Sequence, residues 1–196
     1  MLDDPGCPVS TDVGAALSNA IDAIGQAGAT IVPGWPDGVD PVVSTESFAF
    51  QVGLFFAFAQ PDGTEDTTLA NLIEQEARRM AARAAWTRYF ADIDVFVCPT
   101  NFTTAFPHDQ RPFDARVIST TTGPRAYLEQ PFWIAQPSLP GLPAVAAPIG
   151  ATPTGLPVGA QIIGPLYEDD NAITFAELLA DIIGGFQPPD IDKPIE

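Results

Sequence analysis

The chain has 196 residues and a formal net charge of −17. Leu, Ile, Val and Phe make up 52 of the 196 residues, above the roughly 20% below which a chain is expected to be disordered. A folded domain is therefore expected, and so acidic a surface argues against nucleic acid as a partner.

No targeting or membrane segment is predicted. The N-terminus lacks the basic and apolar regions of a signal peptide. The apolar stretch from Phe48 to Ala59 is too short and too interrupted to span a bilayer. The sequence therefore predicts a soluble cytoplasmic protein with no membrane partner.

The first part of the chain reads as a helix followed by a strand. Ser10 or Thr11 is expected to cap the helix, and Gly28 suits the left-handed residue that ends it. The apolar positions of this helix recur at helical spacing, namely Val13, Leu17, Ala20, Ile24 and Ala27. Residues 29–32 form a short β-type run, and residues 33–41 read as a loop because of their prolines and glycines.

Two further helices are predicted in the middle of the chain. Residues 46–60 carry phenylalanine on every side of the expected cylinder, which favours burial within a larger protein. A second helix begins at Asp66 or Thr67 and ends near Phe90, with a favourable pair of Glu74 and Arg78. Its apolar residues share the opposite face, which we expect to be the packed one: Leu69, Leu72, Ile73, Met80 and Ala84.

The second half of the chain alternates strands and a helix. Residues 94–98 read as a buried strand, and residues 99–131 show no periodicity and are expected to be irregular. Two more strand-like runs, 142–149 and 156–163, are followed by a helix that Asp169 or Asp170 caps and that runs to Ile183. Helices that alternate with short apolar strands indicate an α/β fold. Residues 187–196 are expected to form a loose tail.

Few residues suit catalysis or metal binding. His108 is the sole histidine, and a Ser-His-Asp site would need it to meet Asp109 or Asp114 and Ser119 or Ser138, without any G-x-S-x-G elbow. One histidine and two distant cysteines, Cys7 and Cys98, are too few for a zinc site. No phosphate-binding or dinucleotide-binding motif is present, so no cofactor is expected. A loop histidine and a buried, inert Cys98 are the simpler interpretations.

Three segments resemble the amidase-signature family. The pattern Gly141-Leu-Pro-Ala-Val-Ala-Ala-Pro-Ile-Gly150, followed by Leu156-Pro-Val-Gly-Ala-Gln-Ile-Ile-Gly164, is similar to that family's C-terminal signature. The run Asp94-Val-Phe-Val-Cys-Pro-Thr100 resembles its strand that ends in a Pro-Thr step. The opening Leu2-Asp-Asp-Pro-Gly6 resembles the segment just after its catalytic core.

This resemblance implies a fold, an activity and a partner. It implies that residues 1–196 are the C-terminal part of an amidase fold, a mixed β-sheet flanked by helices. Family members hydrolyse carbon–nitrogen bonds of small amides with two serines and a lysine that lie in the N-terminal half. Those positions have no counterpart here, because the sole lysine is Lys193 and no Gly/Ser-rich stretch occurs. No residue of this chain is therefore assigned as catalytic, and the expected partner is the N-terminal amidase portion.

The resemblance also implies which residues could contact a substrate. In relatives that use glutamine, a carboxylate just before the GLP motif helps to bind the substrate. Here Phe132 and Trp133 stand near that place, which predicts an apolar or aromatic substrate if the segment lines the pocket. Packing of both rings in the core is the competing interpretation.

Two expectations concern stability and role. Gln161 lies within an apolar strand, so its buried amide must find hydrogen-bonding partners. The chain is expected to be poorly stable without the N-terminal portion. A non-catalytic accessory domain or a degenerate paralogue that supports a partner is the alternative role, and whether the chain forms a homo-oligomer stays open.

Overall fold

The computed structural model describes residues 1–58 and 67–188. The helices and strands within these residues are α1 (Thr11–Gln26), α2 (Pro41–Phe58), α3 (Leu69–Tyr89), β1 (Phe96–Pro99), η1 (Phe113–Ala115), β2 (Val117–Thr120), β3 (Gly123–Ala126), η2 (Tyr127–Glu129), α4 (Pro131–Ser138), β4 (Ala144–Ala151), β5 (Pro157–Ile163) and α5 (Asp169–Ile183). The residues outside this description include Gln60, Asp66, Lys193 and nearly all of the predicted tail 187–196.

The strands β1, β5 and β4 form a three-stranded sheet in that order, and every pairing in it is antiparallel. The hairpin β4–β5 closes through a hydrogen bond from the backbone N–H of Thr152 to the carbonyl of Leu156, 2.8 Å. Gly155 adopts a φ of +86°, which is strained for any residue with a Cβ. The two predicted strands, 142–149 and 156–163, are therefore confirmed, and they pair as a hairpin.

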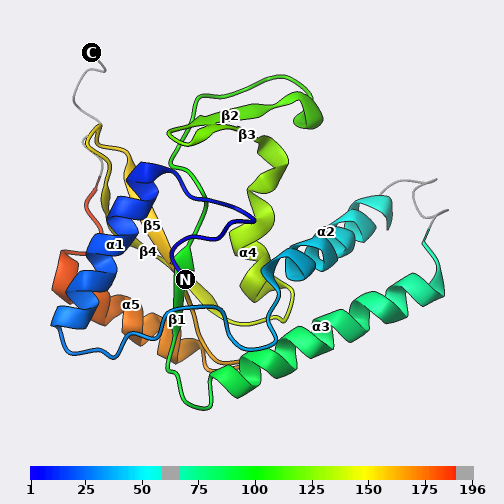
Figure 1. The fold of residues 1–196 in the computed structure, drawn as a ribbon, viewed down its shortest axis with the longest axis horizontal. Helices are drawn as coiled ribbons and strands as arrows, with labels where there is room; N and C mark the ends of the chain where they lie inside the picture. The colour runs from blue at the N-terminus through cyan, green and yellow to red at the C-terminus, as the bar shows by residue number, and fades with distance from the viewer. Residues whose placement is uncertain (59–66, 189–196) are drawn as a thin grey trace.

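The sheet lies between two groups of helices (Figure 1). α1 and α5 contact each other and the sheet on one side, whereas α4 lies on the other side with α2 and α3 beyond it. The predicted α/β architecture, a sheet flanked by helices, is confirmed. The core between these layers is aromatic on the α4 side, where Trp35 stacks on Phe96 at 5.3 Å and on Trp133 at 5.8 Å between ring centroids.

The first and last helices lie where the sequence predicts them. Four apolar positions of α1 are buried, namely Val13, Leu17, Ala20 and Ile24. Ser10 takes the N-cap position, although its side chain makes no capping hydrogen bond. At the other end of the chain, Gly184 closes α5 with a φ of 100°. The predicted aspartate cap is wrong, because Glu168 takes the N-cap position. Asp169 and Asp170 lie in the first turn, where negative charge is favourable.

Residues 29–32 do not form the predicted strand. They are extended without a strand partner among the described residues, and Ile31 and Val32 are 44% and 52% exposed. A β-type run becomes a strand only when a neighbouring strand satisfies its backbone, and nothing in the described chain does so.

The predicted loop 33–41 ends earlier than expected because α2 begins at Pro41. Asp40 Oδ1 accepts hydrogen bonds from the backbone N–H groups of Val42 (2.9 Å) and Val43 (3.1 Å). Proline suits the first position of a helix, since its missing N–H has no partner there in any case. The Asp-Pro pair thus starts the helix five residues before the predicted Glu46.

The region expected to be irregular, residues 99–131, contains a small hairpin. β2 and β3 pair antiparallel, and η2 follows them directly. The short α4 was also missed, since it starts at Pro131 and holds a second proline, Pro137, inside eight residues. Apolar residues lie on most sides of α4, so its sequence lacks the alternation of apolar and polar residues that predicts a helix.

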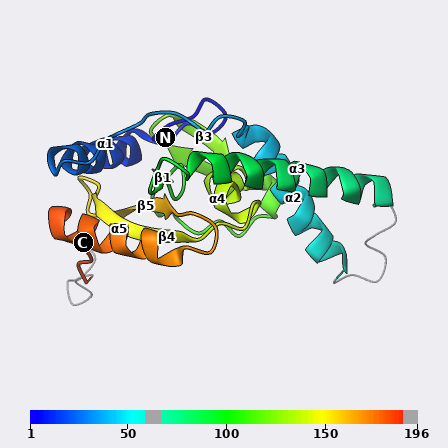
Figure 2. The ribbon, with the colours of Figure 1, turned by 90° about the horizontal axis from the view of Figure 1, so that it is seen from below.

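α2 and α3 extend together away from the sheet (Figure 2). The prediction that α3 packs through its apolar face is wrong: Leu69 is 72% exposed, Ile73 62% and Met80 49%. α3 instead buries Ala82, Ala85 and Trp86 near its end. Within the described residues α2 is also the one helix whose length and composition would let it cross a membrane, and 11% of it is buried.

Candidate functional site

Two of the motif segments meet at one end of the sheet. β1 and β5 pair with Cys98 opposite Gln161 and Pro99 opposite Ala160. The side-chain hydroxyl of Thr100 then donates a hydrogen bond to the carbonyl of Gly159, 3.2 Å away. The Pro-Thr step and the GLPVG segment, 59 residues apart in the sequence, are therefore adjacent in space.

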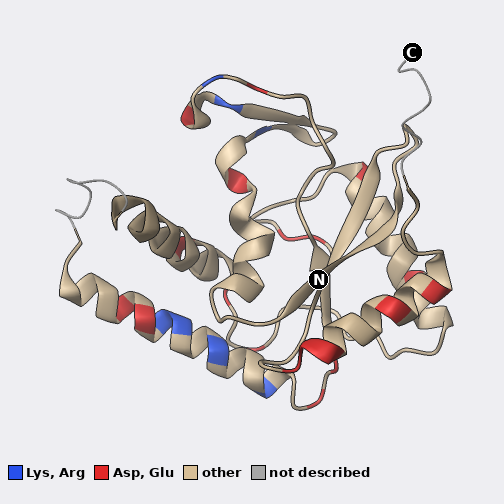
Figure 3. Cartoon of the chain, turned by 180° about the vertical axis from the view of Figure 1, so that it is seen from behind, with Lys and Arg blue, Asp and Glu red and all other residues tan. Residues whose placement is uncertain are grey.

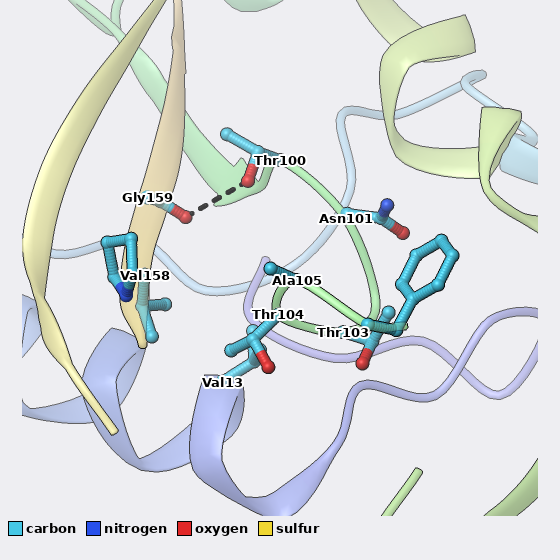
Figure 4. A pocket seen from close by; sticks show the side chains of 10 residues that line it. Val13, Thr100, Asn101, Thr103, Thr104, Ala105, Val158 and Gly159 are labelled. Carbon is cyan, nitrogen blue, oxygen red and sulfur yellow. Dashed lines mark hydrogen bonds between the residues drawn. The ribbon is translucent and has the colours of Figure 1, made fainter. Parts of the chain in front are cut away.

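A cavity of about 210 Å³ opens beside this contact (Figure 4). The residues around it come from the segment after β1, from the start of β5 and from α1: Val13, Thr100, Asn101, Thr103, Thr104, Ala105, Phe106, Pro157, Val158 and Gly159. Asn101 is fixed by its Nδ2 atom, which donates to Gln130 Oε1 at 3.1 Å, and by its Oδ1 atom, which accepts from the N–H of Phe102 at 2.7 Å.

The side chains around this cavity can bind a ligand but cannot by themselves catalyse a reaction. Its residues offer threonine hydroxyls, one amide and apolar carbon, and none of them is a carboxylic acid, lysine, histidine or cysteine. General acid–base or nucleophilic catalysis needs such a group in reach of the substrate, with an adjacent base in the case of a hydroxyl nucleophile. These walls could therefore orient a polar substrate, and the reacting groups would have to come from elsewhere. The wall residues Thr103 and Thr104 were not predicted, although four threonines or asparagines in the five positions after β1 were a usable signal.

Gln161 lies behind the cavity in the centre of the sheet. It is 7% exposed, and its Nε2 atom donates to the carbonyl of Trp133 at 3.1 Å and to Cys98 Sγ at 3.3 Å. The expectation of a buried, hydrogen-bonded amide is confirmed. Burial raises the pKa of the Cys98 thiol to about 11, so that this cysteine is a neutral, inert acceptor.

Phe132 and Trp133 lie in α4 and are 5% and 0% exposed. Their rings contact each other at 5.2 Å between centroids, and neither residue lines the cavity. Trp133 packs on Trp35, whose indole N–H donates to Asp4 Oδ2 at 2.8 Å. Both aromatic rings are thus part of the core of the described chain, and their contact with a substrate stays a prediction.

The alternative serine site does not assemble around His108. The imidazole is exposed, and within residues 1–58 and 67–188 it makes no hydrogen bond to a serine or an aspartate. Asp109 instead accepts from the guanidinium of Arg111 at 2.6 Å and 3.0 Å, and this interaction lowers the pKa of Asp109 to about 2. Across the same described ranges, no three metal-binding side chains lie together.

A larger and mostly apolar groove of about 750 Å³ runs along the free edge of β1. Its walls are the N-terminus, residues 29–34, the segment 92–97 and four residues from three helices: Ile21 and Ile24 of α1, Tyr89 of α3 and Phe175 of α5. The amino group of Met1 donates to the carbonyl of Val97 at 2.9 Å, so the chain begins on this edge. The groove therefore presents extended backbone on both sides of an apolar floor.

Comparison with known proteins identifies the family. The Amidase family profile matches residues 41–173, more than half of the chain. A glutamyl-tRNA(Gln) amidotransferase subunit from Leptospira interrogans is 30% identical over 110 residues, which is 56% of this chain and 20% of that protein. The protein of the same name from Salinispora tropica is 32% identical over 115 residues, 59% of this chain and 21% of that protein. The chain thus spans about a fifth of the length of the curated relatives that it matches.

Solved structures share the fold at low sequence identity. A bacterial aryl acylamidase of the amidase-signature family superposes with a TM-score of 0.66 at 14% identity, over 95% of this chain and 46% of its own. Fatty acid amide hydrolase superposes with a TM-score of 0.67 at 16% identity, over 93% and 38% respectively. These likenesses show the fold, and the profile match over more than half of the chain shows that the chain belongs to the amidase-signature family.

Proposed function

We propose that this chain is the C-terminal part of an amidase that hydrolyses the carbon–nitrogen bond of a small amide. In that reaction the C–N bond breaks, a C–O bond to the carbonyl carbon forms from water, and a carboxylic acid leaves with ammonia or an amine. The observation that carries the proposal is the meeting of the Pro-Thr step and the GLPVG segment at the cavity, through Thr100 and Gly159. Both segments lie within residues 41–173, the part of the chain that the Amidase profile matches.

This chain and the N-terminal portion would contribute different groups to the reaction. The cavity walls of this chain bind and orient the substrate, and an N-terminal portion with the family's serines and lysine supplies the reacting groups. The groove along β1 is the proposed contact for that portion, since an added strand would pair with the free edge and cover the apolar floor. The chain would then act in the cytoplasm, as the sequence predicts.

Phe132 and Trp133 enter the proposal as residues that shape the pocket. The Trp133 carbonyl holds Gln161, which lies two positions along β5 from the cavity residue Gly159. Through this contact α4 supports the strand that borders the cavity, and an apolar or aromatic amide is the substrate class that we propose.

The test is reconstitution with an N-terminal amidase portion, encoded in frame upstream or taken from a relative. Hydrolysis of aliphatic and aryl amides is measured with the chain alone, with the portion alone and with both. We expect turnover only when both are present. Ile31→Asp, at the rim of the groove, should weaken association, and Leu128→Asp, 62% exposed and remote from the groove, should not.

The result that contradicts the proposal is equally specific. Association without hydrolysis of any amide, although the serines and lysine are present, would favour a non-catalytic accessory role. Hydrolysis by the chain alone that survives repurification would place the reacting groups within residues 1–196.

A further inference from the structure

A cluster of aromatic rings continues from the cavity toward the β2–β3 hairpin. Phe106, one of the cavity residues, packs edge-on against Tyr127, with 6.1 Å between ring centroids. Tyr127 in turn contacts Phe113 at 5.7 Å, and Phe113 is 60% exposed. We call these three rings the aromatic rim. A substrate that leaves the cavity past Phe106 therefore meets a row of rings that leads to the surface around η1.

Arg116 places a positive charge on the aromatic rim. The central carbon of its guanidinium, Cζ, lies 4.1 Å from the centre of the Phe113 ring and 5.2 Å from that of Tyr127. Its Nε atom donates to the backbone carbonyl of Arg111 at 2.6 Å, and this bond fixes the group together with the two ring contacts. The carbonyl is uncharged, so it orients the guanidinium without neutralising it.

The neighbouring arginines are neutralised, whereas Arg116 is not. Arg111 pairs with Asp109 at 2.6 Å. Arg125 pairs with Glu129. Within residues 1–58 and 67–188, no carboxylate pairs with the Arg116 guanidinium, and its two Nη atoms make no hydrogen bond. The edge that these two atoms form is one that can bind a carboxylate through two parallel hydrogen bonds.

The charge of the molecule restricts where an anionic group can bind. At a net charge of −17, most of the surface repels anions. Figure 3 shows that the arginines of the described residues gather at two places, along α3 and on the segment that carries the β2–β3 hairpin. Of these two places, the hairpin segment is the one that the aromatic rim connects to the cavity.

We propose that Arg116 is a specificity-determining residue that binds a carboxylate of the substrate. This inference rests on the proposed amidase function and narrows its substrate class to aromatic amides that carry a carboxylate on the ring. The order of amide, ring and carboxylate in such a molecule matches the order of cavity, aromatic rim and Arg116 in the protein. 4-Acetamidobenzoate is a simple amide of this class, and its hydrolysis adds water across the C–N bond to give acetate and 4-aminobenzoate.

A purely structural role is the competing explanation for Arg116, since its stacked guanidinium also holds η1 against η2. The two roles differ in what they predict for uncharged substrates. A structural role predicts equal losses of activity on charged and uncharged amides when Arg116 is replaced. Carboxylate binding predicts a loss that depends on the charge of the substrate.

The experiment compares two amides in the enzyme reconstituted with the N-terminal portion. They are 4-acetamidobenzoate and 4-isopropylacetanilide, in which an uncharged group of similar shape replaces the carboxylate. Arg116→Met keeps an apolar stem on Phe113 and removes the charge. It should lower kcat/KM for 4-acetamidobenzoate by about 10–100-fold, the factor expected when a hydrogen bond between charged groups is lost, mostly through a higher KM. The value for 4-isopropylacetanilide should stay nearly unchanged.

Two further variants complete the comparison. Arg88→Met is the matched control, because it makes the same change in net charge at an exposed residue of α3 outside the cavity and the aromatic rim. It should alter neither value. Arg116→Glu reverses the charge and should make 4-(aminomethyl)acetanilide a better substrate than 4-acetamidobenzoate, a gain that loss of folding cannot produce. The unfolding midpoint of each variant reports whether it is folded.

Equilibrium binding of 4-acetamidobenzoate to the same complex, measured by calorimetry, separates this inference from the amidase proposal. If no amide is hydrolysed, the amidase proposal fails, while binding that Arg116→Met weakens still supports the carboxylate site. Three outcomes would overturn the carboxylate site. They are equal losses of kcat/KM on both amides in Arg116→Met, the same selective loss in Arg88→Met, and unchanged binding of 4-acetamidobenzoate in Arg116→Met.

Discussion

The side-chain amide of Gln161 reaches across from β5 to β1 and places its Nε2 atom 3.3 Å from the sulfur of Cys98. The same nitrogen donates to the carbonyl of Trp133 in α4, 3.1 Å away. One buried amide thus connects two strands of the sheet to the helix that covers them. This connection holds α4 in place behind the cavity.

Replacing that amide tests the connection. Gln161→Leu removes both hydrogen bonds and leaves the Trp133 carbonyl without its donor, so we expect a loss of about 1–3 kcal/mol in the free energy of unfolding. Gln187→Leu is the control, because Gln187 is exposed and its amide donates to the nearby carbonyl of Gly184 at the surface. Urea unfolding of both variants gives the comparison. Equal midpoints for Gln161→Leu and the parent would show that the amide does not contribute.

The two buried thiols predict a loss of stability at alkaline pH. Burial raises the pKa of Cys7 and of Cys98 from 9.0 to about 11, whereas both titrate near 9.0 in the unfolded chain. Between these values the unfolded state loses protons that the folded state keeps, so stability is full below pH 9 and falls as the pH rises toward 11. The loss is on the order of 2–3 kcal/mol per thiol, since one pKa unit is worth about 1.4 kcal/mol.

Thermal unfolding between pH 7 and pH 11 measures this effect, and a Cys7→Ala, Cys98→Ala variant is the comparison. Its stability should fall less steeply in that interval, although burial also raises the pKa of Tyr89 and leaves a smaller decline. Identical slopes for the variant and the parent would mean that the thiols do not titrate as described.

Substitutions of two arginines compare the contribution of a partly buried ion pair with that of an exposed one. Arg125 donates to Glu129 and to the carbonyl of Pro8 at 2.8 Å, and its guanidinium lies 4.8 Å from the centre of the Phe102 ring. Arg125→Ala should destabilise the fold by about 1–3 kcal/mol, because the Pro8 carbonyl and Glu129 lose their donor. Arg111→Ala removes a solvent-exposed pair with Asp109 and should leave the unfolding midpoint nearly unchanged, because water screens this pair. Denaturant unfolding measures the stability of both variants. Equal losses of stability for Arg125→Ala and Arg111→Ala would contradict the prediction.

Gly159 tests the cavity as a substrate wall. A Cβ at this position would lie 3.4 Å from the Ala147 carbonyl and 3.6 Å from the Thr100 methyl group, so alanine fits with little rearrangement. In the reconstituted enzyme we expect Gly159→Ala to keep its unfolding midpoint and to lower kcat/KM by about 10-fold, because the added methyl group changes the position of a bound substrate. Gly53→Ala, where an added Cβ meets nothing within 4 Å, is the control. Unchanged kcat/KM would place the substrate elsewhere.

The parts of this fold that depend on short-range signals were predictable. α1, α5 and the β4–β5 hairpin follow from spaced apolar residues, from glycines such as Gly155 and Gly184 and from the paired GLP motif. The pairing of Gln161 with neighbours could be expected as well, since an amide in an apolar strand needs partners.

The wrong predictions share one cause: the structure of these segments depends on residues that are distant in the sequence. Residues 29–32 have the composition of a strand, but no strand neighbour within the described chain reaches them. The spacing of Leu69, Ile73 and Met80 marks an apolar face on α3, and spacing does not say what covers that face. The polar run that contains Thr103 and Thr104 could be seen in the sequence, but its place beside Gly159 depends on the pairing of β1 with β5, which brings residues 59 positions apart into contact.

The buried amino group of Met1 has a practical consequence for handling the protein. Burial lowers the pKa of this amine, and its hydrogen bond to Val97 starts at the mouth of the apolar groove. A purification tag fused ahead of Met1 removes that charge and sends its first residues along the β1 edge, where a binding partner is expected. A tag that lies along this edge would compete with a partner for it, so the tag is cleaved before association is measured.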